Sequence, residues 1–299
     1  MCQFKSAIVF RDESKKGGFQ LFMSPWTEHH SELITIFKLK DDTRLKFARV
    51  EFTPADMSEA YRPETYTLRI DEERTPQWFD AEMKEKVADK MRAYIKSIIV
   101  LGDVQLLVGG QFIIAPNAKV ECAHSMVINA MCGGTLTEMW GGTLTAMWGG
   151  TLTAMRGGTL TTMRGGTLTT MCGGTLTEMR GGTLTEMWGG TLTEMRGGTL
   201  TAMRGGTLTE MRGGTLTAMW GGTLTEMRGG TLTAMWGGTL TAMRGGTLTT
   251  MCGGTLTEMR GGTLTAIKEW FDGILGKVAK TAKILLGSRP KTKVKKGKK

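Results

Sequence analysis

Residues 173–188 read GGTLTEMRGGTLTEMW, and this pair of octads decides the fold. The octad Gly-Gly-Thr-Leu-Thr-x-Met-z occurs seventeen times over residues 133–268 without insertion, and Ile267 replaces one Met. Self-similarity at a fixed short period is typical of repeat proteins, in which each unit packs on its neighbours. Four degenerate octads over residues 101–132 precede the regular copies.

Each octad predicts one short strand with Leu and Met inward. In the degenerate octads the two Thr positions hold mostly polar residues, whereas the Leu and Met positions stay apolar. We therefore expect both Thr to face water. A bend must separate Leu from Met, because strict alternation would put them on opposite faces. Gly-Gly supplies the turn. An unbroken strand with both Thr and the Met inside is the alternative.

Position z indicates how many octads form one coil. In every second copy z is Arg seven times in eight, and the Arg ladder is Arg164, Arg180, Arg196, Arg212, Arg228, Arg244 and Arg260. The interleaved copies hold mainly Trp, Cys and only two Arg, so the period is sixteen. This pattern predicts a mainly β fold, a flattened parallel β-solenoid with two octads per coil. Duplication of a sixteen-residue unit, followed by drift at tolerant positions, would leave the same pattern.

The flanking segments predict two further structures. Residues 1–100 favour an α+β cap domain, with strands at 4–10, 19–23, 45–52 and 66–70 and an amphipathic helix at 80–99. Residues 269–287 have apolar residues at helical spacing and predict an amphipathic capping helix, followed by a basic disordered tail over 288–299. A solenoid needs its terminal strand edges covered, and these two segments are the candidates for that role.

Composition excludes several classes of protein. The net charge of +10 comes mainly from residues 269–299, which contain 10 basic and 2 acidic side chains. No apolar run is long enough to span a membrane, and the start lacks a signal-peptide pattern, so we expect a cytoplasmic chain. The five Cys show no C-x-x-C spacing and the three His are few, which favours reduced thiols and neither a metal site nor a cofactor. We expect no enzymatic activity, because repeated surface residues create no unique pocket.

The leading hypothesis is a non-enzymatic scaffold that displays Thr, Arg and Trp ladders to an unknown protein or surface. Ice binding through Thr-x-Thr rows is the first alternative, and its candidate residues are Thr135, Thr137, Thr151, Thr153, Thr167, Thr169, Thr183 and Thr185. Binding of nucleic acid or an anionic membrane is the second alternative. It would use the Arg ladder and Lys277, Lys280, Lys283, Lys291, Lys293, Lys295, Lys296, Lys298 and Lys299. Self-association through solenoid ends or edges is a further expectation.

The layout resembles uncharacterised octad-repeat proteins of bacteria and their phages. The shared features are the opening Lys5-Ser6-Ala7-Ile8-Val9, the stretch Pro76-Gln77-Trp78-Phe79 and octads that end in Met-Trp or Met-Arg. Those proteins more often have Asn-Ser-x-Val where this chain has Gly-Gly-Thr-Leu, and the resemblance implies no function. The Thr-x-Thr pattern on a sixteen-residue coil is also similar to bacterial ice-nucleation repeats, although their Tyr-containing and Ser-Leu parts are missing here.

Overall fold

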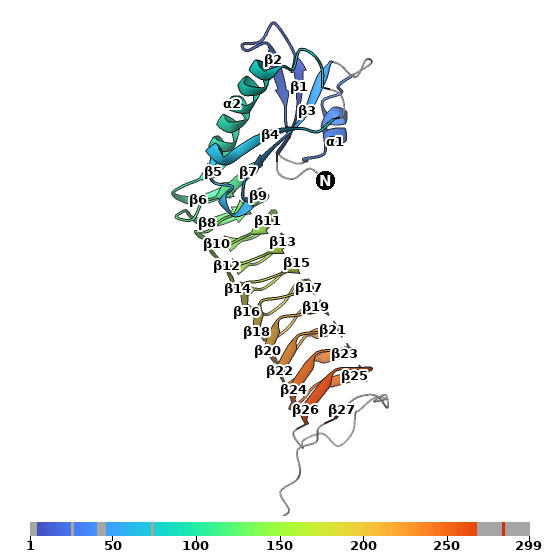
Figure 1. Cartoon of the computed structure of the whole chain (residues 1–299). Coiled ribbons are helices and arrows are strands. Elements are labelled where there is room, and N and C mark those ends of the chain that lie inside the picture. The colour runs from blue at the N-terminus through green and yellow to red at the C-terminus, as the bar shows by residue number, and fades with distance from the viewer. Residues whose placement is uncertain (1–4, 25–26, 41–45, 73–74, 268–282, 285–299) are drawn as a thin grey trace, which may run out of the picture. The chain divides into compact units, whose positions relative to one another are not determined.

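A computed structural model describes residues 5–24, 27–40, 46–72, 75–267 and 283–284 (Figure 1). The chain divides into two compact units, residues 1–177 and residues 178–299. The first unit contains an α+β domain and the first solenoid coils, and the second unit contains the later coils.

The N-terminal domain is a four-stranded antiparallel sheet with two α-helices. The strands follow the order β2-β1-β3-β4 and comprise β1 (Lys5–Arg11), β2 (Phe19–Phe22), β3 (Phe47–Pro54) and β4 (Tyr66–Ile70). The helices are α1 (His30–Ile36) and α2 (Ala81–Ile98), with short 3-10 turns η1 (Met57–Glu59) and η2 (Pro63–Thr65). The four predicted strands and the long helix are therefore confirmed, within one or two residues at most ends.

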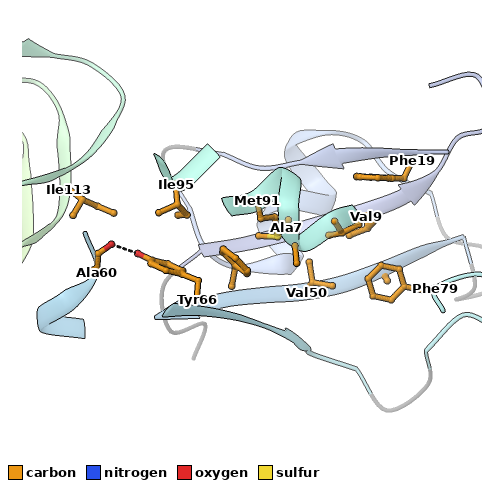
Figure 2. Packing of buried hydrophobic residues seen from close by; sticks show 14 of the residues in the cluster. Ala7, Val9, Phe19, Val50, Ala60, Tyr66, Phe79, Met91, Ile95 and Ile113 are labelled. Carbon is orange, nitrogen blue, oxygen red and sulfur yellow. Dashed lines mark hydrogen bonds between the residues drawn. The ribbon is translucent and has the colours of Figure 1, made fainter. Parts of the chain in front are cut away.

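Helix α2 begins where the sequence provides a cap. The Asp80 carboxylate accepts a hydrogen bond from the Met83 backbone N–H at 2.9 Å, which satisfies one of the free donors at a helix start. Val87, Met91 and Ile95 recur at helical spacing and are buried. They pack with residues of β1 and β3 in one core, in which the Tyr66 hydroxyl donates to the Ala60 carbonyl at 2.7 Å (Figure 2).

The solenoid strands are five residues long in all regular octads. The early strands are β5 (Ile99–Val100), β6 (Asp103–Val108), β7 (Gln111–Ile114), β8 (Lys119–His124) and β9 (Val127–Met131). The regular strands are β10 (Thr135–Met139), β11 (Thr143–Met147), β12 (Thr151–Met155), β13 (Thr159–Met163), β14 (Thr167–Met171), β15 (Thr175–Met179), β16 (Thr183–Met187), β17 (Thr191–Met195), β18 (Thr199–Met203), β19 (Thr207–Met211), β20 (Thr215–Met219), β21 (Thr223–Met227), β22 (Thr231–Met235), β23 (Thr239–Met243), β24 (Thr247–Met251), β25 (Thr255–Met259) and β26 (Thr263–Ile267).

The strands pair in parallel at a spacing of sixteen residues in both units. In the first unit Thr135 pairs with Thr151, and in the second unit Thr191 pairs with Thr207. From β5 to β26, odd-numbered strands pair with odd-numbered strands and even-numbered strands with even-numbered ones (Figure 1). This confirms the parallel β-solenoid with two octads in each coil.

The solenoid core consists of stacked Leu and Met side chains. Leu is buried in all seventeen regular octads and Met in sixteen, so the predicted bend between them is present and the strand with Thr inside is wrong. Burial of one such side chain stabilises the fold by roughly 1.5–3 kcal/mol. The second glycine of each turn has a positive φ between 69° and 86°, a region that L-residues rarely adopt.

The N-terminal domain packs against the outward side of the first odd-numbered strands. Ile113 of β7 and Ala130 of β9 belong to the buried core of the domain, and Cys132 and Trp148 lie half-buried at its margin. Lys5 is fully buried, and its Nζ donates to the Glu28 carboxylate at 2.9 Å and to the Gln111 Oε1 at 3.0 Å. The first odd-numbered strands are therefore covered by the domain on their outward side.

Two features differ from the sequence-based expectation, and a third predicted element lies outside the described residues. Helix α1 was not predicted, because its seven residues are too few to show a periodic pattern. The register between β7 and β9 shifts after Phe112, so Ile113 pairs with Ala130, which breaks the octad frame expected there. The predicted helix over 269–287 lies outside the described residues, except that Lys283–Ile284 form a short strand, β27, which pairs with β26.

Candidate functional site

Positions x and z of each octad face outward, and the sixteen-residue coil arranges them in columns. We call the outward side of the odd-numbered strands β5 to β25 the odd face, and that of the even-numbered strands β6 to β26 the even face. The two faces share one backbone design but differ in chemistry. The z residues of the odd face are mainly Arg, and those of the even face include four Trp.

The odd face of the second unit contains alternating Arg and Glu side chains. Glu194 contacts Arg196 of its own octad, with Oε2 to Nη2 at 3.0 Å, and Arg212 of the next coil, with Oε1 to Nε at 2.7 Å. Glu178, Glu210 and Glu226 repeat this double contact. Each of these Glu therefore lies between two Arg that are sixteen residues apart.

The Arg side chains shield the Glu side chains from water. In these pairs the Glu side chains are 15–19% exposed and the Arg side chains 46–49% exposed. The buried Oε1 of Glu210 lies 3.0 Å and 2.8 Å from the Nε atoms of Arg212 and Arg228, as a charge contact rather than an aligned hydrogen bond. The hydrogen bond from Arg228 lowers the pKa of Glu226, and the bond to Glu226 raises the pKa of Arg228. The charges of this column largely neutralise one another.

The Arg–Glu column has an interruption near its end. Ala242 occupies position x beside Arg244, which pairs with Glu226 of the preceding coil at 2.6 Å and has no carboxylate in its own octad. Arg260 contacts Glu258 of its own octad, also at 2.6 Å. Arg164, in the first unit, lies over the Trp148 ring at 4.6 Å instead. The structure thus assigns most of the predicted Arg ladder to ion pairs within the chain.

The even face contains two copies of a Glu–Trp–Arg cluster. In the first unit Trp140 Nε1 donates to Glu138 at 2.8 Å, and Arg156 both pairs with Glu138 at 2.7 Å and lies 4.8 Å from the Trp140 ring centre. In the second unit Glu186, Trp188 and Arg204 form the same contacts, at 2.8 Å, 3.1 Å and 4.8 Å. A guanidinium at this distance attracts the ring face electrostatically.

At β20 and β22 of the second unit the even face is aromatic and has no charged side chain at position x or z. Trp220 and Trp236 stack with ring centres 5.2 Å apart and planes within 8° of parallel. Their x neighbours are Ala218 and Ala234, which provide no carboxylate. The four exposed Trp of this face have exposed fractions of 46–53%. Among the described residues of the second unit, Trp188, Trp220 and Trp236 form an apolar column along successive even coils, with Arg204 between them.

The Thr rows are less exposed than the sequence predicted. The first Thr of every octad is half-buried, because it lies directly after the turn. The second Thr is exposed in most octads, but of the eight named candidates only Thr153 is exposed. Thr135, Thr137, Thr151, Thr167, Thr169, Thr183 and Thr185 are half-buried. Position five is therefore exposed in most coils, as expected, whereas position three is only partly exposed in every regular coil.

The remaining candidates lie mostly beyond the described residues. Of the nine named Lys only Lys283 is described, as part of β27.

Within the described ranges no group of three or more His, Cys, Asp or Glu could hold a metal ion. Cys132 contacts the domain, and burial raises the pKa of its thiol to about 11. A groove of about 430 Å³ between β4 and α2 is lined by Lys84, Glu85 and Arg92 among others.

Sequence reasoning missed the contacts between coils. The Arg–Glu pairs join residues eighteen apart, which is one coil plus two positions, and the Glu–Trp–Arg clusters use the same spacing. A search for Glu followed eighteen residues later by Arg would have found both the Arg–Glu pairs and the Glu–Trp–Arg clusters.

No helix in the described part of the chain has the length and apolar character needed to cross a membrane. Comparison with protein-family models, curated proteins and solved structures gives no match for this chain.

Proposed function

We propose that this protein is a non-enzymatic scaffold that binds a partner along the Trp column of its even face. The observation that supports this proposal is the row of half-exposed Trp rings, stacked on Arg or on each other and on the same face of successive coils. Exposed Trp and Arg are the residues that contribute most binding energy at protein interfaces. Monomeric soluble proteins rarely expose contiguous apolar surface without such a role.

An identical octad elsewhere in the chain already serves as a docking surface. Residues 141–148, 213–220 and 229–236 all read GGTLTAMW. In the first of these, Trp148 is half-buried against the N-terminal domain. In the other two, Trp220 and Trp236 are exposed. This comparison favours the even face of the second unit as the place where a partner binds.

The odd face is less suited to bind a charged partner. Its Arg guanidinium groups contact Glu of their own and neighbouring coils, so a phosphate would have to compete with ion pairs that exist already. Binding of nucleic acid or anionic membrane through this column therefore remains the weaker candidate. The Lys-rich segment after residue 287 carries net positive charge and is the stronger candidate for that activity.

The experiment compares two triple variants of the full chain. Trp188, Trp220 and Trp236 are replaced by Arg, which position z accommodates at Arg204; in the control Arg196, Arg212 and Arg228 are replaced by Gln. Proteins captured from the cell of origin, oligo-dT and anionic vesicles are tested as partners. Loss of one anchoring Trp weakens binding by roughly 30-fold or more. The proposal fails if every partner binds the Trp variant as tightly as the intact chain.

Ice binding is a second candidate, favoured by the Thr at position five. These side chains are exposed in most coils, and the paired strands place them in register at a spacing of sixteen residues. In-register strands repeat about every 4.8 Å, which is the regularity that a hydroxyl lattice needs. The test is thermal hysteresis of the intact chain against a Thr217→Lys, Thr233→Lys variant. Absence of any crystal shaping by the intact chain would remove this candidate.

A further inference from the structure

Strand β4 leaves one edge of the N-terminal sheet free within the described residues, because it is the last strand in the order β2-β1-β3-β4. It pairs antiparallel with β3, and the Asp71 N–H donates to the Arg49 carbonyl at 2.9 Å. Bonded and non-bonded pairs alternate along an antiparallel ladder, so Ile70 and Leu68 direct their N–H and C=O groups away from β3. Such an edge is a template on which another chain can add a strand.

A groove of about 430 Å³ lies along this strand, and helix α2 forms its other wall. Lys84, Ala88 and Arg92 line the helix wall, and their spacing of four residues puts them on one side of the helix. Leu68 and Ile70 line the strand wall, where their side chains are only half-buried. The groove therefore combines free backbone groups, an apolar lining and a cation near each end.

The length of the groove matches an extended peptide. Lys84 and Arg92 are eight residues apart on one helix, which separates them by about 12 Å. In a strand, residues i and i+4 point to the same face and are about 13 Å apart. Tyr66, at the start of β4, lies near Ile95, toward the end of α2, so the strand and the helix run in opposite directions (Figure 2). A strand added along β4 therefore places side chains i, i+2 and i+4 beside Lys84, Ala88 and Arg92 in turn.

Charge selects acidic side chains at the two outer positions of such a strand. The charged side chains that line the groove are Lys84, Glu85 and Arg92, two basic and one acidic. No ion pair of Lys84 is found among the described residues, whereas Arg92 pairs with Asp89 of its own helix through Nη1. That pair is exposed and contributes little, and the guanidinium has further N–H donors for a second carboxylate. Between the two cations the small Ala88 leaves space for an apolar side chain at i+2.

We propose that the β4 edge binds an extended segment of an acidic partner protein, with carboxylates at positions i and i+4 and an apolar side chain at i+2. The segment is added antiparallel to β4, because every pair in this sheet is antiparallel and such pairing is the more stable kind. The Lys-rich segment after residue 287 of this chain has the opposite charge and does not fit. The site is separate from the Trp column, so the inference does not rest on the proposed function.

The first measurement tests the charges with a fluorescein-labelled peptide, Thr-Glu-Thr-Leu-Thr-Glu-Thr with blocked ends. The full chain is titrated to about 1 mM and binding is followed by anisotropy. A Lys84→Glu, Arg92→Glu variant should bind the peptide at least about tenfold more weakly, and it should bind a peptide with Lys in place of both Glu more tightly than the intact chain does. This exchange of sign separates a docking charge from damage to the fold. The control Lys86→Glu, Lys96→Glu makes the same change of charge at exposed positions of α2 outside the groove and should bind as the intact chain does.

The second measurement tests the backbone pairing. In the antiparallel arrangement the Leu N–H of the peptide donates to the Leu68 carbonyl, so methylation of that nitrogen should weaken binding at least about fivefold. Methylation of the Thr that follows Leu places the same group on a nitrogen that points away from β4, and this peptide should bind as the unmodified one does. In a parallel arrangement the two methylated peptides would exchange roles.

Each outcome either supports or overturns the inference. Sign-dependent binding that is lost only on methylation of the Leu nitrogen supports it. Absence of binding up to about 1 mM overturns it, as does equal binding by the Lys84→Glu, Arg92→Glu variant or equal binding of the two methylated peptides. Loss confined to the methylated Thr overturns the antiparallel orientation. The variant with Trp188, Trp220 and Trp236 replaced by Arg should bind the peptide as the intact chain does, and loss of binding there would place the peptide on the Trp column instead.

Discussion

Two adjacent glycines in one turn should respond in opposite ways to the same substitution. Gly141 and Gly142 both precede strand β11. A Cβ at Gly141 would have the Ser125 backbone N as its nearest neighbour, at 3.9 Å, which is ordinary contact. A Cβ at Gly142 would collide with the Met126 carbonyl oxygen and lie 2.7 Å from the Met126 backbone N, and Gly142 has a φ of +80°.

The magnitudes follow from these two environments. Gly142→Ala should cost about 1–2 kcal/mol for the left-handed conformation and about 1–3 kcal/mol for the forced displacement of backbone. Gly141→Ala should stabilise the chain by about 0.4–1 kcal/mol, because Ala restricts the unfolded chain. The two variants should thus differ by about 2–6 kcal/mol in free energy of unfolding.

The assay is equilibrium unfolding in urea, followed by circular dichroism. Gly157→Ala is a third variant, at the equivalent first glycine one coil later, where a Cβ would lie 2.6 Å from the Trp140 carbonyl oxygen. This substitution should also lower the free energy of unfolding, although the φ of Gly157 lies outside the left-handed region. Equal stability of the Gly141 and Gly142 variants would contradict the close packing of Gly142 on Met126, sixteen residues earlier.

Three further changes test other parts of the structure. Ala242→Glu should fill the interruption in the Arg–Glu column and raise the midpoint of thermal unfolding slightly at low salt but not at high salt. The control Ala218→Glu places the new carboxylate beside Trp instead of Arg and should not raise the midpoint at either salt concentration. Cys132, whose pKa is raised to about 11 by burial, should react with iodoacetamide at least about 100-fold more slowly at pH 8 than the exposed Cys172, and equal rates would contradict its burial. Lys5→Met should lower the free energy of unfolding by about 3 kcal/mol, because it leaves a half-buried carboxylate without its cation; an unchanged urea midpoint would contradict this.

The solenoid could be predicted from the sequence because its determinants are local and repeated. The alternation of Arg and non-Arg at position z gave the sixteen-residue coil, and the constant Leu and Met gave the core. The second Thr was assigned correctly in most coils. The half-burial of the first Thr was missed, since its exposure depends on the turn that precedes it and not on the pattern of the strand.

The contacts over long separations could not be predicted in the same way. Lys5 at the start of a strand would be expected at the surface, yet it is buried because Glu28 and Gln111, 23 and 106 residues away, bond its ammonium group. Burial lowers the pKa of Lys5, and the charge of Glu28 opposes that effect. A single sequence offers no periodic signal for such a contact. Helix α1 was missed for the related reason that one or two turns show no period.

The same octad sequence is half-buried in one place and exposed in two others, which separates the determinants of fold from those of binding. Leu144, Leu216 and Leu232 are equally buried in their GGTLTAMW octads, so the coil itself does not depend on what lies outside it. The outward positions change their environment: Trp148 contacts the domain and Ala146 is buried, whereas Trp220 is exposed and Ala218 is half-buried. Substitutions at z should therefore alter what the solenoid binds without altering how it folds, since Trp, Arg and Cys occupy this position on the same backbone.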